Sequence, residues 1–307
     1  MDTIQNPGGM WPVMLTPYTD DGRVDYPSLE RLIHWYEENG ADGLFAVCQS
    51  SEMFFLSLRE RVRVAEFVKS HASIPVIASG HTSYDLEDQK AELQAVAAAG
   101  VDAVVLITNR MDCHCHGRNA AEWLENLQRL MDALDPELSL GLYECPAPYK
   151  HLLSDEEIRF AADSGRFLFL KDTCCDMDVI RRRLDIIKGS PLRLFNANSS
   201  TLLDSMRAGA AGFSGIMANF HAALYAKLLA CWKDQPELAE RIQAHLSLCS
   251  RMEGQCYPVN AKYSLKKLGV LSTINCRSND PARFSPLMAQ EVDYMTRITD
   301  DLLASLG

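Results

Sequence analysis

The chain of 307 residues is 47% hydrophobic and 23% charged and carries a net charge of −11, a composition typical of a soluble globular protein with a large core. The acidic balance argues against nucleic acid or an anionic membrane surface as a partner. No apolar run approaches the about 18 residues of a membrane span. The first residues lack the regions of a signal peptide, and the ten cysteines lack the spacing of a disulfide scaffold. We therefore expect a cytoplasmic protein that binds no membrane.

The first half of the chain alternates short apolar runs with stretches of helical periodicity. The strands that we expect there lie at 9–16, 43–47, 74–78 and 103–107. Helices are expected at 28–39, from Ser57 onward, at 84–99 and at 118–133. Ser57 and Glu60 have the spacing of a capping box, which marks the beginning of a helix.

The second half repeats this alternation. Strands are expected at 138–143, 167–170, 192–195 and 212–214, and helices from a second capping box at Ser154, at 177–187 and at 201–208. Eight such units predict an α/β fold, the (β/α)8 TIM barrel. Further helices near 219–233, 236–250, 257–268 and 284–304 would supply the eighth barrel helix and a C-terminal helical extension. We therefore expect a barrel at 1–233 that carries the active site, and an extension at 234–307 packed on it.

One expected strand is followed directly by a lysine. Residues 167–170 form an unbroken apolar run, as in strands buried on both faces of a parallel sheet. Lysine is rarely buried without a partner, so one interpretation is that Lys171 lies in a solvated loop. The other is chemical. In a partly desolvated pocket the pKa of the amine falls, and the neutral amine can attack a carbonyl to form a Schiff base.

The expected barrel favours the chemical interpretation, because the working residues of such folds sit at the carboxyl ends of the strands. A phenol, an amine and a loop with small hydroxyl groups belong to that face, at Thr16, Gln49, Ser50, Ser51, Glu52, Thr108, Tyr143, Lys171 and Ser214. Such groups converging on one mouth predict an active site.

Seven segments then form a pattern over nearly the whole chain. They are Leu15-Thr16-Pro17-Tyr18, Cys48-Gln49-Ser50-Ser51-Glu52, Leu56-Ser57 with Glu60-Arg61, Ile74-Pro75-Val76-Ile77-Ala78 before Gly80, Leu142-Tyr143-Glu144-Cys145-Pro146, Leu170-Lys171-Asp172-Thr173, and Tyr257-Pro258-Val259-Asn260-Ala261-Lys262 with Leu268-Gly269. Together they resemble the motifs of the dihydrodipicolinate synthase/N-acetylneuraminate lyase family of class I, pyruvate-type aldolases. The resemblance implies a barrel enzyme without a cofactor, a 2-keto acid and an aldehyde as substrates, and a homo-oligomer, either a dimer or a tetramer.

The resemblance also implies roles for individual residues. Lys171 would form the imine, and Tyr143 would carry the proton of the reacting hydroxyl. Chemistry alone supports both roles, because a protonated imine lets a bond break or form at the next carbon and a positioned phenol can transfer the proton. Tyr143 could instead be a core tyrosine whose hydroxyl has a protein partner. Substrate-binding roles fall to Thr16, Gln49, Ser50, Ser51, Thr173 and Ser214, of which the Ser50 hydroxyl and its loop suit a carboxylate.

Several positions depart from the family's pattern. Cys48-Gln49 replaces a glycine-threonine pair, so Ser50 alone keeps a hydroxyl there. Met111 replaces the tyrosine that completes a proton relay with the neighbouring subunit in the synthases, and Pro148 replaces the arginine that recruits the aldehyde's carboxylate. Ser199-Ser200 replaces the acidic pair of the sialic-acid lyases. We therefore expect the pocket to disfavour aspartate semialdehyde and sialic acid and to take a less polar or shorter substrate, with an aromatic tail and a deoxy-sugar-acid tail as two options between which the sequence does not choose.

A run of metal-type ligands, Asp112-Cys113-His114-Cys115-His116, follows the fourth expected strand. Zinc sites usually separate their ligand pairs by a turn and need three or four convergent ligands. Cys174-Cys175 is the other support for a metal site. We expect no metal here, and the resemblance places this run in a loop at a subunit contact.

The sequence leaves several functions open. The first is a Schiff-base aldolase, lyase or hydro-lyase acting on a 2-keto acid, with dihydrodipicolinate synthase itself as one alternative. Others are a non-catalytic binder of keto acids on the same barrel and a metal-dependent hydrolase that uses the cysteine-histidine run. The sequence chooses neither the aldehyde partner nor the direction of the reaction.

Overall fold

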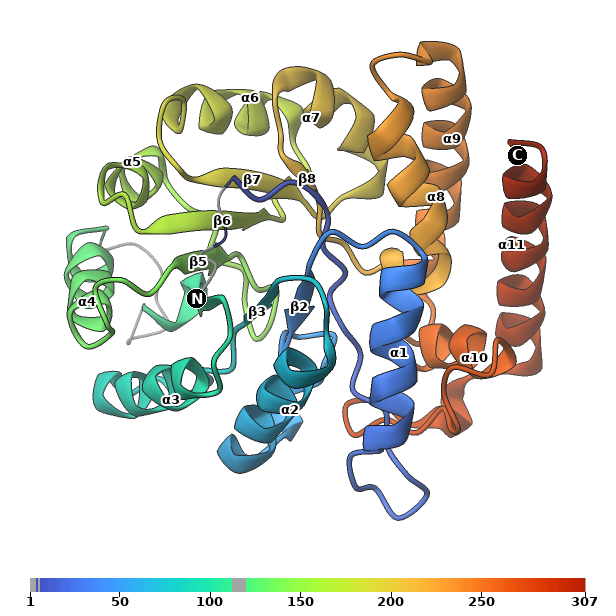
Figure 1. Cartoon of the computed structure of the whole chain (residues 1–307), viewed down its shortest axis with the longest axis horizontal. Helices are drawn as coiled ribbons and strands as arrows, with labels where there is room; N and C mark the ends of the chain where they lie inside the picture. Colours follow the sequence, from blue (N-terminus) through green and yellow to red (C-terminus); the bar gives the residue numbers. More distant parts are fainter. Residues whose placement is uncertain (1–3, 5, 112–119, 307) are drawn as a thin grey trace.

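The computed structural model describes residue 4 and residues 6–111 and 120–306. Its centre is an eight-stranded sheet of parallel pairs with the order β1-β8-β7-β6-β5-β4-β3-β2. The strands are β1 (Gly9–Met10), β2 (Leu44–Ala46), β3 (Val76–Ala78), β4 (Ala103–Ile107), β5 (Leu140–Tyr143), β6 (Phe167–Asp172), β7 (Arg193–Asn196) and β8 (Gly212–Phe213). Each strand is followed by a helix that lies outside the curled sheet (Figure 1). The predicted TIM barrel is therefore confirmed.

The helices follow the predicted order. They are α1 (Tyr26–Glu38), α2 (Leu58–His71), α3 (Leu86–Ala98), α4 (Ala120–Asp132), α5 (Asp155–Asp163), α6 (Met177–Ile186), α7 (Leu202–Ala208), α8 (Ala218–Cys231), α9 (Pro236–Cys249), α10 (Val259–Lys267) and α11 (Pro286–Ala304). Short 3-10 turns occur at η1 (Met53–Phe55), η2 (Thr108–Arg110), η3 (Ser199–Thr201), η4 (Ser250–Gly254) and η5 (Pro281–Arg283). Both predicted capping boxes are present, at Ser57 with Glu60 and at Ser154 with Glu157.

The first strand is shorter than predicted. We expected it to run to Thr16, but regular pairing with β8 ends at Met10. Pro12 and Pro17 cannot donate the backbone hydrogen bonds of a ladder, so a long first strand is disfavoured. A single parallel bridge, Val13 with Phe45, joins this segment to β2 and closes the barrel.

Aromatic side chains fill the inside of the barrel. Phe169 on β6 contacts Phe45 on β2, with ring centroids 5.8 Å apart, although these strands lie on different sides of the ring of strands. Trp11 also contacts Phe169 in a tilted arrangement and Phe195 stacks on it, with ring centroids 5.7 and 4.4 Å away. Because side chains two residues apart on a strand share a face, Lys171 lies on the same inward face as Phe169. The aromatic layer therefore forms a floor beneath the lysine.

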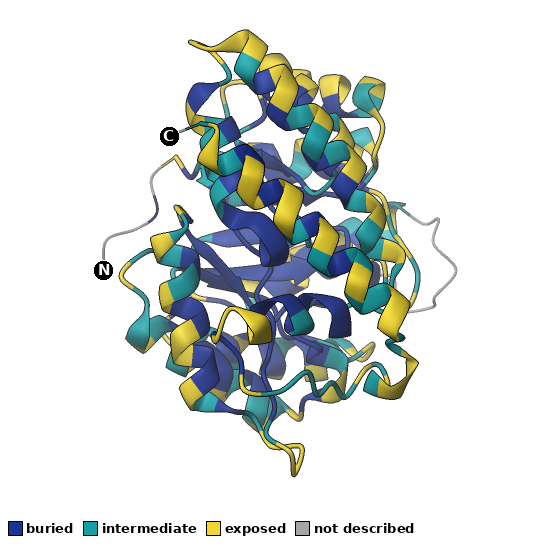
Figure 2. Cartoon of the chain, turned by 90° about the vertical axis from the view of Figure 1, so that its right-hand side faces the viewer, coloured by how far each residue is buried: buried dark blue, intermediate teal, exposed yellow. Residues whose placement is uncertain are grey.

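The C-terminal helices pack against one side of the barrel. Helices α9, α10 and α11 each contact α8, and Figure 1 shows α11 as the outermost helix of this group. Figure 2 shows α11 with a buried face toward the molecule and an exposed face toward solvent. The division of the chain at residue 233 stays a prediction.

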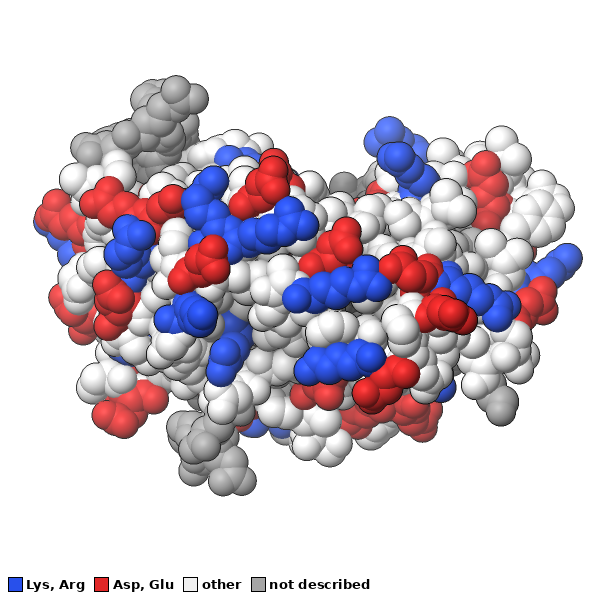
Figure 3. Space-filling model, turned by 90° about the horizontal axis from the view of Figure 1, so that it is seen from above, with Lys and Arg blue, Asp and Glu red and all other residues white. Residues whose placement is uncertain are grey.

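The surface carries charges of both signs. Figure 3 shows lysine and arginine side chains interspersed with aspartate and glutamate on the face seen there. Within the described ranges, no helix combines the length and the apolar character that a membrane crossing would need.

Candidate active site

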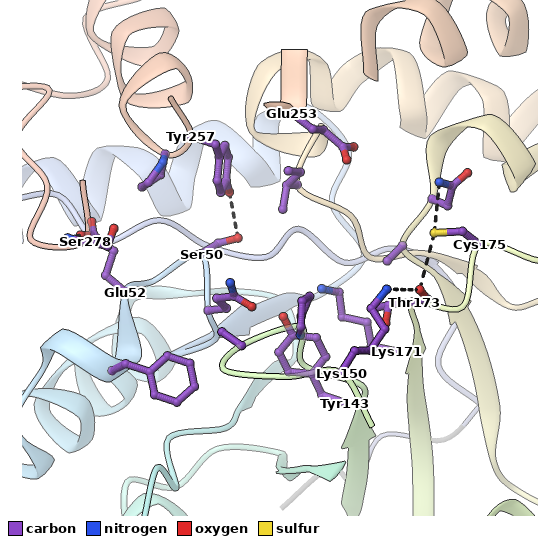
Figure 4. A pocket seen from close by; sticks show the side chains of 18 of the residues that line it. Ser50, Glu52, Tyr143, Lys150, Lys171, Thr173, Cys175, Glu253, Tyr257 and Ser278 are labelled. Atoms are coloured by element: carbon purple, nitrogen blue, oxygen red, sulfur yellow. Dashed lines mark hydrogen bonds between the residues drawn. The ribbon is translucent and has the colours of Figure 1, made fainter. Parts of the chain in front are cut away.

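A cavity of about 460 Å³ lies at the carboxyl ends of the strands (Figure 4). Barrel loops line it on one side and the C-terminal segment on the other. The lining residues include Gln49, Ser50, Glu52, Phe54, Phe55, Tyr143, Lys150, Lys171, Thr173, Cys175, Asn198, Ile216, Glu253, Tyr257 and Ser278. Five of the predicted site residues therefore meet here, namely Lys171, Tyr143, Ser50, Gln49 and Thr173.

The Lys171 side chain is only 4% exposed, although it belongs to the wall of the cavity. Burial lowers the pKa of its amine below the ordinary value of 10.5, because the ammonium form loses hydration. The thiols of Cys48 and Cys145 and the carboxyl of Glu253 oppose that shift. An amine in this setting loses its proton more readily than a lysine in water.

Tyr143 lies beside this amine. It is the register partner of Lys171 in the β5–β6 pair, and the lysine Nζ lies 4.2 Å from the centre of the tyrosine ring. The ring packs on Phe45 with centroids 5.6 Å apart, so the aromatic floor fixes it from below. Burial raises the pKa of its phenol well above 10, so the hydroxyl holds its proton at neutral pH.

Ser50 contacts a tyrosine that the sequence patterns did not single out as a site residue. The Tyr257 hydroxyl donates a hydrogen bond to Ser50 Oγ at 2.8 Å (Figure 4). Asn219 Nδ2 donates one to the Tyr257 hydroxyl at 3.0 Å. Tyr257 stands just before α10, in a segment that the sequence resemblance had already marked. The spacing of that motif gave no sign that its first residue would reach the barrel mouth.

Three other predicted residues lie outside the cavity lining. The Thr16 hydroxyl donates to the Ser51 carbonyl at 2.8 Å, and the Ser51 hydroxyl donates to the Met14 carbonyl at 2.7 Å. Both side chains hold the loop between β2 and η1 against the first segment of the barrel. Ser214 is fully buried, and its hydroxyl has no hydrogen-bond partner among the residues that the structure describes.

Glu52 anchors the same loop from its other end. It adopts a left-handed backbone conformation, with φ of 60°. Its buried carboxylate accepts from Lys262 Nζ at 2.6 Å and from the backbone N–H groups of Arg277 and Ser278 at 2.6 and 2.7 Å. This carboxylate therefore ties the loop to the C-terminal segment.

A buried ion network supports the lysine strand. Arg183 on α6 donates to both carboxylate oxygens of Glu144, at 2.6 and 3.1 Å, and to the carboxylate of Asp172. Glu144 also accepts from the backbone N–H of Thr173 at 2.9 Å, and the Thr173 hydroxyl donates to the Glu144 carbonyl at 2.9 Å. The network joins the residues that follow Tyr143 and Lys171, and so fixes the ends of β5 and β6 relative to each other.

The cavity also has polar residues that sequence reasoning missed. Lys150 Nζ donates to the Thr173 carbonyl at 2.8 Å, and Asn198 Nδ2 donates to Cys175 Sγ at 3.4 Å. Glu253 comes from η4, between α9 and α10. These residues lie in loops and in the C-terminal segment, where no strand periodicity points to a shared cavity.

Within the described residues, no group of three or more histidine, cysteine or acidic side chains could hold a metal ion. The run from Cys113 to His116 lies outside the described residues, so the prediction made for it stays open. Cys175 lines the cavity, whereas the thiol of Cys174 donates to the carbonyl of Asp176 at 3.5 Å.

Comparison with known proteins agrees with the fold. Residues 6–291 match the profile described as the dihydrodipicolinate synthetase family. The 4-hydroxy-tetrahydrodipicolinate synthase of Psychrobacter sp. (strain PRwf-1) is 27% identical over 268 residues, which cover 85% of each chain. The crystal structure of dihydrodipicolinate synthase from Acinetobacter baumannii complexed with pyruvate superposes with a TM-score of 0.84 at 21% identity, covering 96% of this chain and 99% of that one. CdNal from Clostridium difficile in complex with mannosamine gives a TM-score of 0.83 at 17% identity and covers 95% and 99%. The chain therefore belongs to the dihydrodipicolinate synthetase family of aldolases and lyases.

Proposed function

We propose that the protein is a lyase or aldolase that forms a Schiff base between Lys171 Nζ and a 2-keto acid such as pyruvate, with an aldehyde as the second substrate. The observation that supports this most directly is the buried amine. Lys171 is 4% exposed, ends β6 beside Tyr143 and has a lowered pKa. A neutral lysine amine in such a cavity is a nucleophile toward carbonyl carbon.

The proposed reaction proceeds through an imine and an enamine. The amine attacks the keto carbon and forms a C–N bond, and loss of the former carbonyl oxygen as water leaves a protonated imine. In cleavage, the hydroxyl at C4 gives up its proton, the C3–C4 bond breaks, and its electron pair moves toward the imine to form an enamine. The aldehyde departs, the enamine takes a proton at C3, and water releases the keto acid and the amine. Condensation runs these steps backward.

Tyr143 is the proposed carrier of the hydroxyl proton. Its raised pKa means that it can accept a proton only while passing its own onward. Ser50 and the substrate carboxylate are the groups suited to receive it. Tyr257 donates to Ser50 within the same chain, whereas Met111 is fully buried in the core. We propose that Tyr257 orients the Ser50 hydroxyl in place of a residue from another subunit.

The keto acid's carboxylate is assigned to the loop after β2. The Ser50 hydroxyl and the Gln49 side chain both line the cavity. Thr16 and Ser51 would act indirectly, because their hydroxyls hold this loop through backbone carbonyls. We assign no substrate contact to Ser214.

The activity of 4-hydroxy-tetrahydrodipicolinate synthase is the main alternative, since the Psychrobacter relative has that name. Pro148 disfavours it, because proline offers no side-chain donor for the aldehyde's carboxylate. We further propose that the enzyme is cytoplasmic and is a homodimer or homotetramer. A non-catalytic keto-acid binder on the same barrel remains a second alternative.

Borohydride trapping tests the proposal. Incubation with pyruvate and borohydride should add one reduced pyruvate per chain, located at Lys171 by peptide mass spectrometry. Lys171→Arg should abolish the adduct and leave the far-UV spectrum unchanged, because arginine stays protonated. Reversible binding without trapping would instead favour a non-catalytic binder, and an adduct at another lysine would contradict the assignment of Lys171.

A further inference from the structure

A chain of hydrogen bonds runs from the Ser50 hydroxyl at the cavity wall into the core of the molecule. Tyr257 donates to Ser50 Oγ at 2.8 Å (Figure 4), and Asn219 stands behind Tyr257, with its Nδ2 3.0 Å from the phenol oxygen. Tyr36 follows and donates to Asn219 Oδ1. Tyr36 on α1 and Asn219 near the start of α8 are completely buried. The chain therefore connects the cavity to two helices that contribute no side chain to its lining.

The Asn219 amide has only one possible orientation in this chain. Its Nδ2 donates to the Val13 carbonyl at 3.0 Å as well as to the Tyr257 hydroxyl. A backbone carbonyl can only accept, so the group that faces Val13 must be the NH2 group, and the amide oxygen must face Tyr36. Both protons of the NH2 group are thus engaged, one by Val13 and one by Tyr257.

This orientation determines the direction of the next two hydroxyl groups. The Tyr257 oxygen accepts from Asn219, so its own proton points to Ser50 Oγ. Burial raises the pKa of the Tyr257 phenol well above 10, so the phenol keeps that proton at neutral pH. The proton of the Ser50 hydroxyl has no acceptor among residues 6–111 and 120–306. Because Ser50 lines the cavity, a bound ligand can supply this acceptor.

We propose that Asn219 is a positioning residue for the keto acid, which acts through Tyr257 to hold the Ser50 hydroxyl as a hydrogen-bond donor to the substrate carboxylate. The proposal rests on the aldolase function proposed above. A hydroxyl by itself can donate in either direction, whereas a primary amide cannot exchange its donor end for its acceptor end without rotating away from Val13. A carboxylate only accepts, so a hydroxyl that already points outward binds it without the cost of reorientation.

Asn219→Asp tests the proposal because it reverses the chain with almost no change in shape. A carboxyl has at most one proton, and the Val13 carbonyl requires it, so the Tyr257 hydroxyl must donate toward the new carboxyl in either protonation state. Ser50 would then donate to Tyr257 and no longer to the substrate. The pyruvate concentration that half-saturates cyanoborohydride trapping at Lys171 should rise roughly 10–100-fold, as expected for a hydrogen bond to a charged group. The maximal trapping rate should change little, because the amine is not altered.

A double-mutant cycle separates the direction of the hydrogen bonds from other effects of a buried carboxyl. Tyr257→Phe removes the hydroxyl that links Asn219 to Ser50, so adding Asn219→Asp to it should change the half-saturating concentration less than about twofold. Asn126→Asp introduces a carboxyl at another buried asparagine, which donates to the Met111 carbonyl, and should keep the wild-type value. An unchanged value in Asn219→Asp, or an equal rise with and without the Tyr257 hydroxyl, would overturn the proposal.

A smaller substitution serves if Asn219→Asp does not fold. Asn219→Ala frees the Tyr257 hydroxyl to turn without forcing it, so the half-saturating concentration should rise by about 2–5-fold, and this rise should vanish in the Tyr257→Phe background. A rise that persists there would contradict the proposal. Trapping of pyruvate at Lys171 in the wild type tests the proposed function by itself. Its failure would concern that function alone, whereas normal trapping with a wild-type half-saturating concentration in the Asn219 variants would concern the chain alone.

Discussion

At the scale of single residues, burial disfavours the charged form of the Lys171 amine. Its amine is buried at the end of β6, and its pKa lies below 10.5. The imine-forming species is the neutral amine, whose fraction rises with pH through that lowered pKa. The rate of pyruvate imine formation should therefore increase with pH and level off below 10.5. Stopped-flow rates, or trapping by cyanoborohydride at a series of pH values, would show this, and an inflection at or above 10.5 would contradict it.

The phenol of Tyr143 can be tested without disturbing its ring. Tyr143→Phe keeps the packing on Phe45 and removes only the hydroxyl. Pyruvate trapping should stay close to the wild-type level, whereas turnover with the aldehyde partner should slow by roughly 10²–10⁴-fold, the usual contribution of a positioned acid or base. Single-turnover kinetics separate the two steps. Full activity in this variant would place proton transfer elsewhere.

From the contact between Tyr257 and Ser50 we predict a smaller effect on the rate. Tyr257→Phe removes one hydrogen bond from Ser50 Oγ, so the bond-breaking step should slow by roughly 5–10-fold, as expected for about 1 kcal/mol. The pH dependence of kcat should also change if the phenol orients a group in the proton path. Tyr263→Phe removes a phenol whose partner is Asp293, and it serves as the matched control. Equal rates and pH profiles in both variants would remove Tyr257 from the mechanism.

Both residues predicted to be catalytic line the cavity, whereas three of the predicted binding residues do not. Lys171 and Tyr143 follow buried strands, and the chemistry of an amine beside a phenol is recognisable from the chain alone. Ser214 follows β8 directly, whereas Thr16 lies six residues beyond the end of the short β1, and neither residue belongs to the cavity lining. Position at a strand end predicts the face of the barrel, whereas the direction of one side chain depends on local backbone geometry.

At the scale of elements, the network of Glu144, Asp172 and Arg183 connects β5, β6 and α6. Arg183→Met leaves two buried carboxylates without their cation, so the free energy of unfolding should fall by about 3–5 kcal/mol. Arg182 is the neighbouring control. Its side chain is 54% exposed and pairs with Asp155, so Arg182→Met should cost less than about 1 kcal/mol. Urea denaturation of both variants measures the difference, and similar losses would argue against a supporting role for the network.

Helices were easier to predict than the ends of strands. Ser57 and Ser154 begin their helices as predicted. The two hydrogen bonds of a capping box join residues three apart in the chain, so the sequence alone identifies them. The predicted length of the first strand was wrong. The apolar residues around Pro12 form a continuous run in the sequence, but the proline cannot donate a backbone hydrogen bond to the neighbouring strand. Such an interruption is local, so the barrel closes through the bridge of Val13 with Phe45.

At the scale of the whole molecule, the C-terminal segment completes the cavity. Lys262 on α10 forms a buried ion pair with Glu52, which lies more than half the chain away in sequence. Lys262→Met should lower the free energy of unfolding by about 3–5 kcal/mol and weaken keto-acid binding, because Ser50 belongs to the same loop as Glu52. Lys267→Met removes an exposed pair with Asp293 and should change both quantities little. Unchanged keto-acid affinity in Lys262→Met would show that the loop holds its shape without this anchor.

The barrel itself could be predicted from eight alternations of apolar runs and helices. The contribution of Glu253 and Tyr257 could not, because both residues lie in the connection between α9 and α10, and the packing of the extension on the barrel mouth was left open. Periodicity reports which face of a helix is buried, and it does not report what that face covers.

The distance along the chain between Lys171 and Ser278, which line one cavity, has a consequence for biosynthesis. At about 5–20 residues per second, the ribosome adds Ser278 roughly 5–20 s after Lys171. During that interval Lys171 has been made, whereas the segment that encloses its pocket has not. The imine chemistry proposed for Lys171 should therefore begin only late in translation, so that nascent chains stay inert toward the pyruvate around them.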